Sequence, residues 1–180
     1  ARGAGLSGLS ATRRRRVLEP GVTLVRPLLD WRRAELRAIV DAAGLTPVDD
    51  PANRDPRHDR TRFRGLLDDA DWADAERLAS SARWLAEADE AIDWAMQGLV
   101  RDRLRQDDAG LSLDPAGLPR EMQRRLLLTG FDRMAAPRPR GPELDRALAA
   151  LAAGRKVTLS GMALRGGKRW RLAKEPPRRR

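Results

Sequence analysis

Residues 156–173 read Lys156-Val157-Thr158-Leu159-Ser160-Gly161-Met162-Ala163-Leu164-Arg165-Gly166-Gly167-Lys168-Arg169-Trp170-Arg171-Leu172-Ala173. Short apolar runs alternate here with glycine turn signals, which is the pattern of antiparallel strands joined by tight turns. We expect strands at 156–159, 162–164 and 169–173. Because the patterned segments before them are mostly helical, the chain is predicted to be α+β and predominantly helical, with a short antiparallel sheet near its end.

The segments just before this sheet predict the rest of a small domain. We expect a short strand at 111–113, a helix at 120–134, and a second helix at 143–153 that stops at Gly154. A proline-rich break at 137–142 separates the two helices. The polar run at 106–110 is a plausible boundary, so the sequence divides into domains 1–108 and 109–180.

A long connecting helix is expected at 72–104. Its apolar residues recur in a heptad-like seam: Leu78, Ala82, Leu85, Ile92, Met96 and Leu99. Such a seam favours a helix packed within a bundle over a free coiled-coil dimer.

The first part of the chain predicts fewer regular elements. Residues 1–21 are expected to form a loop and 22–25 a strand. A helix at 31–43 has Asp30 as its predicted N-cap and Gly44 as its stop. A loop at 46–57 leads to a short helix at 60–67, which we expect to present Phe63, Leu66 and Leu67 to a core.

Charge points to a polyanionic partner. The net charge is +10 and the estimated pI is about 11.4, which suits nucleic acid. Residues 68–108 carry a balance of −7, which leaves +17 for the flanks, so the binding surfaces are expected on the flanks with the middle as a connector. Only three basic residues are lysines, and such arginine bias is also produced by a GC-rich genome.

Residue types exclude several classes of site. The chain has no cysteine and one histidine, His58, so it lacks the ligands of a zinc site and no metal site is predicted. No apolar run approaches the roughly 20 residues that span a bilayer. With no cysteines and no secretory signal, a cytoplasmic protein is expected.

The stretch richest in potential site residues is Asp49-Asp50-Pro51-Ala52-Asn53-Arg54-Asp55, followed by Asp59-Arg60-Thr61-Arg62-Phe63-Arg64. A turn this dense in Pro, Asn and Asp is typical of functional loops. Arg60 and Arg64 lie four residues apart and share one helical face, where two guanidiniums can engage successive phosphates, or one phosphate and a carboxylate from the loop. The structural alternative is an Asx-turn with Asp55 or Asp59 paired to an arginine.

This stretch resembles the tRNA(Ile)-lysidine synthases. It keeps Asp50, Asn53, Asp55, Arg60 and Arg64 of their motif, with Thr61 where they usually have Asn. Two further segments are similar to that family: the start, Arg2-Gly3-Ala4-Gly5-Leu6-Ser7-Gly8-Leu9, resembles its R-G-x-G-L-x-G-L, and residues 154–161 resemble a run in its small substrate-binding domain.

The resemblance implies an ATP-dependent ligase that attaches L-lysine to the wobble cytidine (C34) of tRNA(Ile) with a CAU anticodon, using ATP and Mg²⁺. No S-G-G-x-D-S loop occurs in the 180 residues. We therefore expect the catalytic residues and the ATP-gripping loop upstream of Ala1, and this chain to be the C-terminal portion, inactive alone. Residues 1–108 would end the catalytic domain, and 109–180 would form the small tRNA-binding domain.

The candidate tRNA-binding residues lie in both parts of the chain: Arg2, Asn53, Asp55, Arg60, Arg64, Lys168, Arg169 and Arg171. The last three flank Trp170, which is either a stacking surface for bases or a core residue. The runs 13–16 and 178–180 are solvated arginines or non-specific phosphate contacts.

Two other functions stay open. A stand-alone RNA-binding module without catalysis explains the charge equally well, and a helical interaction protein would use the 78–99 seam. Formation of a homodimer also stays open.

Overall fold

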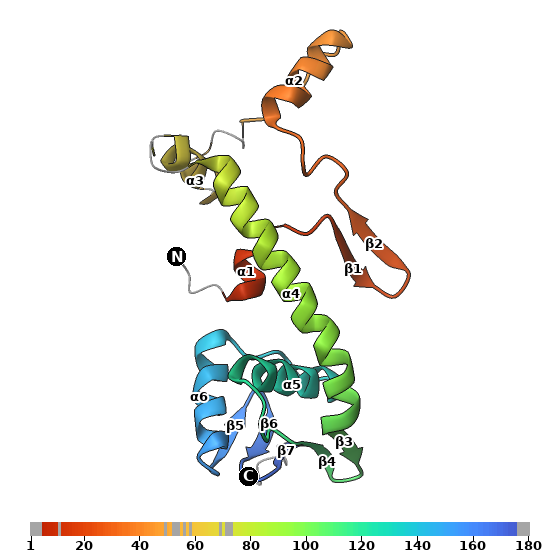
Figure 1. Cartoon of the computed structure of the whole chain (residues 1–180), viewed down its shortest axis with the longest axis vertical. Helices are drawn as coiled ribbons and strands as arrows, with labels where there is room; N and C mark the ends of the chain where they lie inside the picture. The colour runs from red at the N-terminus through yellow and green to blue at the C-terminus, as the bar shows by residue number, and fades with distance from the viewer. Residues whose placement is uncertain are drawn as a thin grey trace. The chain divides into compact units, whose positions relative to one another are not determined.

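Figure 1 shows the computed structural model of the chain. The structure describes residues 5–10, 12–48, 50–51, 55, 57, 59–68, 70 and 74–175. The helices are α1 (Leu6–Leu9), α2 (Arg33–Ala42), α3 (Asp59–Asp68), α4 (Ala75–Arg103), α5 (Arg120–Arg133) and α6 (Gly141–Ala152). The strands are β1 (Arg15–Glu19), β2 (Val22–Val25), β3 (Leu104–Asp107), β4 (Gly110–Leu113), β5 (Lys156–Leu159), β6 (Met162–Arg165) and β7 (Trp170–Lys174). The predicted α+β class is confirmed.

The chain divides into two compact units, Ala1–Asp89 and Glu90–Arg180, here called unit 1 and unit 2. The division falls within the long helix α4. Strand β3 pairs with β4, so the sheet of unit 2 already begins at Leu104. The functional domains expected at 1–108 and 109–180 stay a prediction.

Unit 2 is a five-stranded antiparallel sheet with helices on one face. The strand order is β3-β4-β7-β6-β5, and α5 and α6 pack on the same face of the sheet (Figure 1). Alternate strand residues point to these helices, as the period of two requires. The fully buried side chains form one core: Leu111, Leu113, Leu126, Leu127, Phe131, Leu148, Leu151, Met162, Trp170 and Leu172.

Two turns fix the strand pairing of unit 2. Ser160 and Gly161 both have positive φ, 48° and 75°, between β5 and β6, which is the conformation of a two-residue type I′ hairpin. Between β6 and β7, a Cβ on Gly166 would lie 2.3 Å from the carbonyl oxygen of Leu151. Only glycine lets this turn pass so close to the end of α6.

Ion pairs link the helices of unit 2. Arg125 of α5 donates to Asp93 of α4 at 2.5 Å, and Arg124 of α5 donates to Asp145 of α6 at 2.5 Å. The hydrogen bond from Arg124 is the first cause of a lowered pKa at Asp145. These pairs hold the helices to one another beside the apolar core.

Unit 1 has little core of its own. Among its described residues no hydrophobic side chain is buried, and the buried residues are Ser10 and Asp89. Phe63 and Leu66 of α3 are 59% and 63% exposed, so the expectation that they face a core is wrong in this structure, while the side chain of Leu67 lies outside the described part. The reason is that no described apolar surface of unit 1 closes over them.

Buried Asp89 joins the N-terminal segment to α4. Its carboxylate accepts a hydrogen bond from the Ser7 hydroxyl at 2.9 Å and pairs with Arg13. Arg26 in turn donates to the carbonyl oxygen of Arg13 at 2.8 Å. A buried carboxylate needs such donors, and here they come from the segment that contains α1 and leads into β1.

Three local expectations need correction. Residues 15–19 form β1 rather than loop, because they pair with β2 across a tight hairpin. Residue 104 begins β3 rather than ending the long helix, and β3 continues through residues 106 and 107, where a polar boundary was expected. Asp30 does not cap α2: the helix begins after Arg32, whose N–H donates to Glu35 at 2.7 Å, while Asp30 pairs with Arg14.

Candidate nucleic-acid interface

Asp55 and Arg57 form a tight pair just before α3. The Asp55 carboxylate accepts the backbone N–H of Arg57 at 2.9 Å and its guanidinium N–H groups at 2.7 and 2.9 Å. This bond raises the pKa of Arg57 above its usual value. The structural alternative of a local turn with Asp55 paired to an arginine is therefore present, and it holds a guanidinium that is 88% exposed.

Helix α3 carries the two arginines of the predicted grip. Arg60 and Arg64 lie four residues apart on this helix, and so on one face; their side chains lie outside the described part. Asp59, at the first turn, pairs with Arg62 at 3.8 Å. Two other candidates, Arg2 and Asn53, and the single histidine His58 also lie outside the described residues.

The candidate residues of unit 2 lie in three different surroundings: the core, the outer face of the sheet and a turn. Trp170 is buried in the core at 2% exposure, so the interpretation of its ring as a stacking surface is wrong. Arg171 points to the opposite face and pairs with Asp107 at 3.0 Å. Lys168 and Arg169 are exposed in the turn between β6 and β7.

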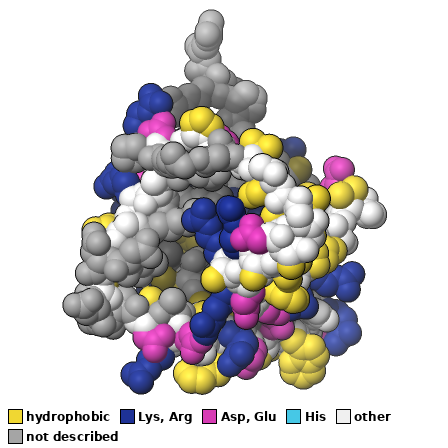
Figure 2. Space-filling model, turned by 90° about the horizontal axis from the view of Figure 1, so that it is seen from above, with side chains coloured by type: hydrophobic (Ala, Val, Ile, Leu, Met, Phe, Trp, Pro, Cys, Tyr) yellow, Lys and Arg dark blue, Asp and Glu magenta, His cyan; other side chains and the backbone are white. Residues whose placement is uncertain are grey.

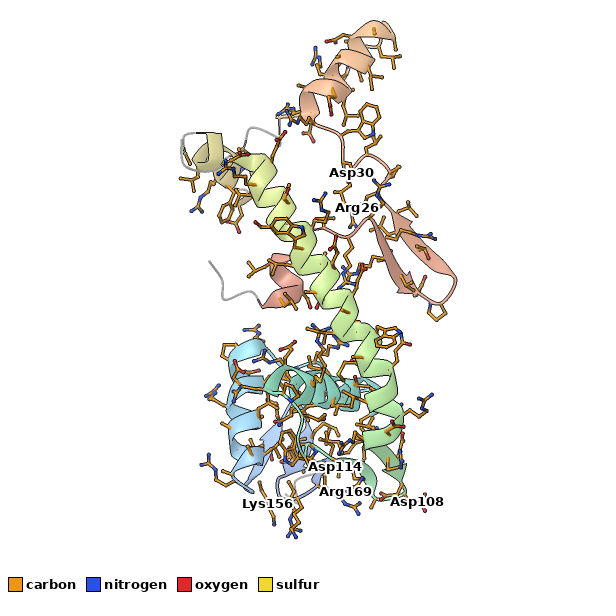
Figure 3. All side chains as sticks on the ribbon, in the orientation of Figure 1. Arg26, Asp30, Asp108, Asp114, Lys156 and Arg169 are labelled. Carbon is orange, nitrogen blue, oxygen red and sulfur yellow. The ribbon has the colours of Figure 1, made fainter. Side chains whose placement is uncertain are left out.

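Asp114 lies at the same end of the sheet as Arg169, where it accepts hydrogen bonds from two neighbours. Its carboxylate accepts the N–H of Ala116 at 3.0 Å and the guanidinium of Arg103 at 3.0 Å. The bond from Ala116, with Arg103 and the charge of Arg169, lowers the pKa of Asp114. Figure 3 shows Arg169 and Asp114 between Lys156 and Asp108, which lie at opposite sides of the sheet.

Arg57, with its exposed guanidinium, is a further candidate that the motif does not include. Its signal was present in the sequence as an acidic residue two positions earlier, which is the spacing of a local side-chain turn. The burial of Asp89 could not be predicted, because it is one of several acids on a polar helix and its neighbours are exposed; it becomes visible only when Ser7 and Arg13 are placed beside it.

Charged side chains of both signs mark the surface. Figure 2 shows basic and acidic side chains close together on the face in view, with apolar ones exposed among them. Among the described residues, no group of three or more metal-binding side chains comes together. No helix in the described part of the chain is long and apolar enough to cross a membrane.

Comparison with known proteins covers the whole chain. Residues 1–69 match the PP-loop domain family. The chain is 39% identical to the tRNA(Ile)-lysidine synthase of Zymomonas mobilis over 100% of this chain and 56% of that protein. It is 42% identical to that of Novosphingobium aromaticivorans, covering 99% and 56%, and 41% identical to that of Ruegeria pomeroyi, covering 97% and 43%. The resemblance to the tRNA(Ile)-lysidine synthases is confirmed.

The matches to known proteins differ between the two units. The chain spans about half the length of the curated relatives it matches. The PP-loop match ends within the segment that contains α3 and lies entirely in unit 1. Unit 2, with its own core, lies beyond that match and is still covered by the alignments to the lysidine synthases.

Proposed function

We propose that this chain is the tRNA-recognition part of an ATP-dependent ligase that attaches L-lysine to C34 of tRNA(Ile) with a CAU anticodon. The observation that carries the proposal is the alignment of the whole chain, through both units, with lysidine synthases at 39% and 42% identity. The net charge of +10 suits an RNA partner.

In this proposal unit 1 completes the catalytic domain. Its described residues bury no hydrophobic side chain, while Trp31, Phe63 and Leu66 are about half exposed or more. A PP-loop domain extending beyond this chain would cover that apolar surface. The chain alone would then lack activity.

Arg60 and Arg64 would grip tRNA from α3, with Asp55 and Asn53 shaping the loop before it and Arg2 near the nucleotide. Phosphate contacts of this kind fix the register of an RNA, and a few splayed bases supply specificity. ATP and Mg²⁺ belong to the proposed reaction. The described residues bring together no group of three or more acidic, histidine or cysteine side chains that could hold Mg²⁺.

The test uses the complete protein that contains this chain, incubated with ATP, lysine and a tRNA(Ile) transcript bearing CAU. We expect one lysidine per tRNA with release of AMP, detected by mass spectrometry of the nucleosides. A protein that binds this tRNA but makes no lysidine would support the stand-alone RNA-binding module instead.

A matched pair of variants tests the role of α3. Arg64→Ala should lower the rate of lysine transfer at limiting tRNA by about tenfold or more, the effect of one lost charged hydrogen bond. Arg62→Ala removes the same group from the same helix, where it pairs with Asp59, and should change the rate less than threefold. Equal effects of the two substitutions would contradict the role given to Arg64.

A further inference from the structure

The outer face of the sheet in unit 2, opposite α5 and α6, carries a row of cations. Lys156 lies directly opposite Arg165 on the neighbouring strand, and Arg165 lies directly opposite Arg171 on the next. All three side chains are exposed. Directly opposite residues on one face have Cβ atoms about 4.5–5.5 Å apart, so β5, β6 and β7 present three adjacent positive charges.

This arrangement opposes stability, because like charges directly opposite one another in a sheet repel. Arg171 is compensated by Asp107 at 3.0 Å. For Lys156 and Arg165, no hydrogen bond or ion pair of the side chain is found within the described part of the chain. Two adjacent cations therefore have no acidic partner among the described residues.

A hollow lies beside the row. It has a volume of about 570 Å³ and is lined by Lys156, Arg165 and Arg171 together with uncharged residues of the same strands and Ala109 of the turn between β3 and β4. Thr158, Ala163 and Ala173 form the next row of directly opposite residues. Because these side chains are short, a ligand can approach the sheet while the longer cations reach around it.

The chemistry of this face selects the kind of ligand. Among the described residues of β3 to β7 the one aromatic side chain is Trp170, which is buried on the other face. The face therefore has no platform on which bases could stack, unlike sheets that read single-stranded RNA. Guanidinium and ammonium groups bind phosphate oxygens well.

We propose that Lys156, Arg165 and Arg171 form a binding site for the phosphodiester backbone of RNA on the outer face of the sheet, independent of base sequence. The site rests on the proposed function, which supplies a tRNA as the RNA. Lys168 and Arg169 follow Arg165 in the turn that joins β6 to β7, so they extend the positive charge beyond the row. The site ends at the far edge of the sheet with two acidic residues, Asp107 at the end of β3 and Asp108 in the turn to β4.

The test compares Lys156→Thr/Arg165→Thr with a control, Arg133→Thr, in the complete protein. Arg133 is exposed on α5, on the other side of the sheet. The probes are the tRNA(Ile) transcript and an RNA duplex of unrelated sequence, with binding measured between 0.05 and 0.2 M salt. Each lost phosphate contact should weaken binding about five- to eightfold at 0.1 M salt and reduce the salt slope by about 0.7 to 0.9.

A second readout separates binding from folding. Removing the facing cations relieves repulsion, so the double variant should unfold at the same temperature as the wild type or slightly higher, while it binds both RNAs more weakly. Unchanged binding of both RNAs, or the same loss in Arg133→Thr, would overturn the site. If the natural partner of this face is an acidic protein, the double variant should bind both RNAs as the wild type does.

Failure of the two proposals can be told apart. If the wild-type protein makes lysidine but the double variant binds RNA normally, the sheet site is wrong and the ligase stands. If the wild-type protein makes no lysidine but the double variant loses binding to both RNAs, the ligase is wrong and the backbone site stands.

Discussion

Asp89 shows how one buried charge can position a loop. It is fully buried on a helix whose neighbouring acids are solvated, and Ser7 and Arg13 donate to its two oxygens. The Ser10 hydroxyl also donates to the carbonyl oxygen of Ser7 at 2.9 Å. Because a buried carboxylate without donors is costly, these bonds specify where the glycine-rich N-terminal segment meets α4.

We expect Asp89→Asn to loosen this segment. The amide keeps the shape of the side chain but loses the charge that Arg13 binds, and hydrogen bonds to charged groups contribute about 1.5–3 kcal/mol. Backbone amides of residues 6–10 should exchange with solvent at least tenfold faster in the complete protein, as measured by hydrogen exchange and mass spectrometry. The control is Glu87→Gln, an exposed acid on the same helix; if both variants exchange alike, Asp89 does not hold the segment.

At the scale of elements, α5 and α6 are joined by a carboxylate whose charge is favoured by folding. Asp145 accepts from Arg124 at 2.5 Å and from Arg120 at 3.3 Å, and the bond from Arg124 is the main cause of its lowered pKa. A carboxyl whose pKa is lower in the folded protein stabilises the fold above its unfolded pKa, near 4. That contribution is lost as the pH falls from about 4 through the folded pKa.

Asp145→Asn should therefore destabilise unit 2 by about 0.5–1 kcal/mol at pH 7, the value of a half-exposed ion pair. The difference from the wild type should be smaller at pH 2.5, because the charge of Asp145 is progressively lost as the pH falls below about 4. Urea unfolding followed by circular dichroism at both values measures it. Asp108→Asn, at an exposed carboxyl in the β3–β4 turn, should have little effect at either pH; a pH-independent loss in Asp145→Asn would refute the electrostatic origin.

Elements with strong apolar periodicity could be predicted from the sequence, and charged edges could not. The ends of the strands from Lys156 onward, and of the helices before them, are predicted within a few residues, because glycine turns and apolar spacing mark where each element begins and ends. Strands β1 and β3 were missed, since Arg15–Glu19 and Leu104–Asp107 are mostly charged or polar. Such strands lie at sheet edges, where charge prevents association with other chains.

The candidate site was predictable only in part, for a related reason. Alternation along one strand places Trp170 and Arg171 on opposite faces, yet the adjacent cations also suit a stacking ring. That Lys156 faces Arg165 depends on the register between two strands, which is set by the Ser160-Gly161 turn. The outer-face row therefore becomes visible only in three dimensions.

At the scale of the whole molecule, the two units differ in their capacity to fold. Every buried hydrophobic residue of the described chain lies between Met96 and Leu172. A polypeptide of residues 75–180, which keeps all of α4, should unfold cooperatively in urea. Residues 1–89 alone should show no cooperative transition and should bind a dye that detects exposed apolar surface. A cooperative transition in residues 1–89 would mean that unit 1 needs no covering domain.

Gly166 limits which substitutions unit 2 can accept during evolution. Alanine, serine, valine, aspartate, glutamate and arginine are among the residues that one base change in a glycine codon can produce. Each would place a Cβ 2.3 Å from a backbone oxygen at the end of α6 and 2.9 Å from the backbone of Gly154. Both neighbours are backbone atoms, which cannot move aside as the end of a side chain can. In a saturation library selected for function, almost all surviving variants should therefore keep glycine at position 166. Exposed Lys168, two residues later, should accept many replacements.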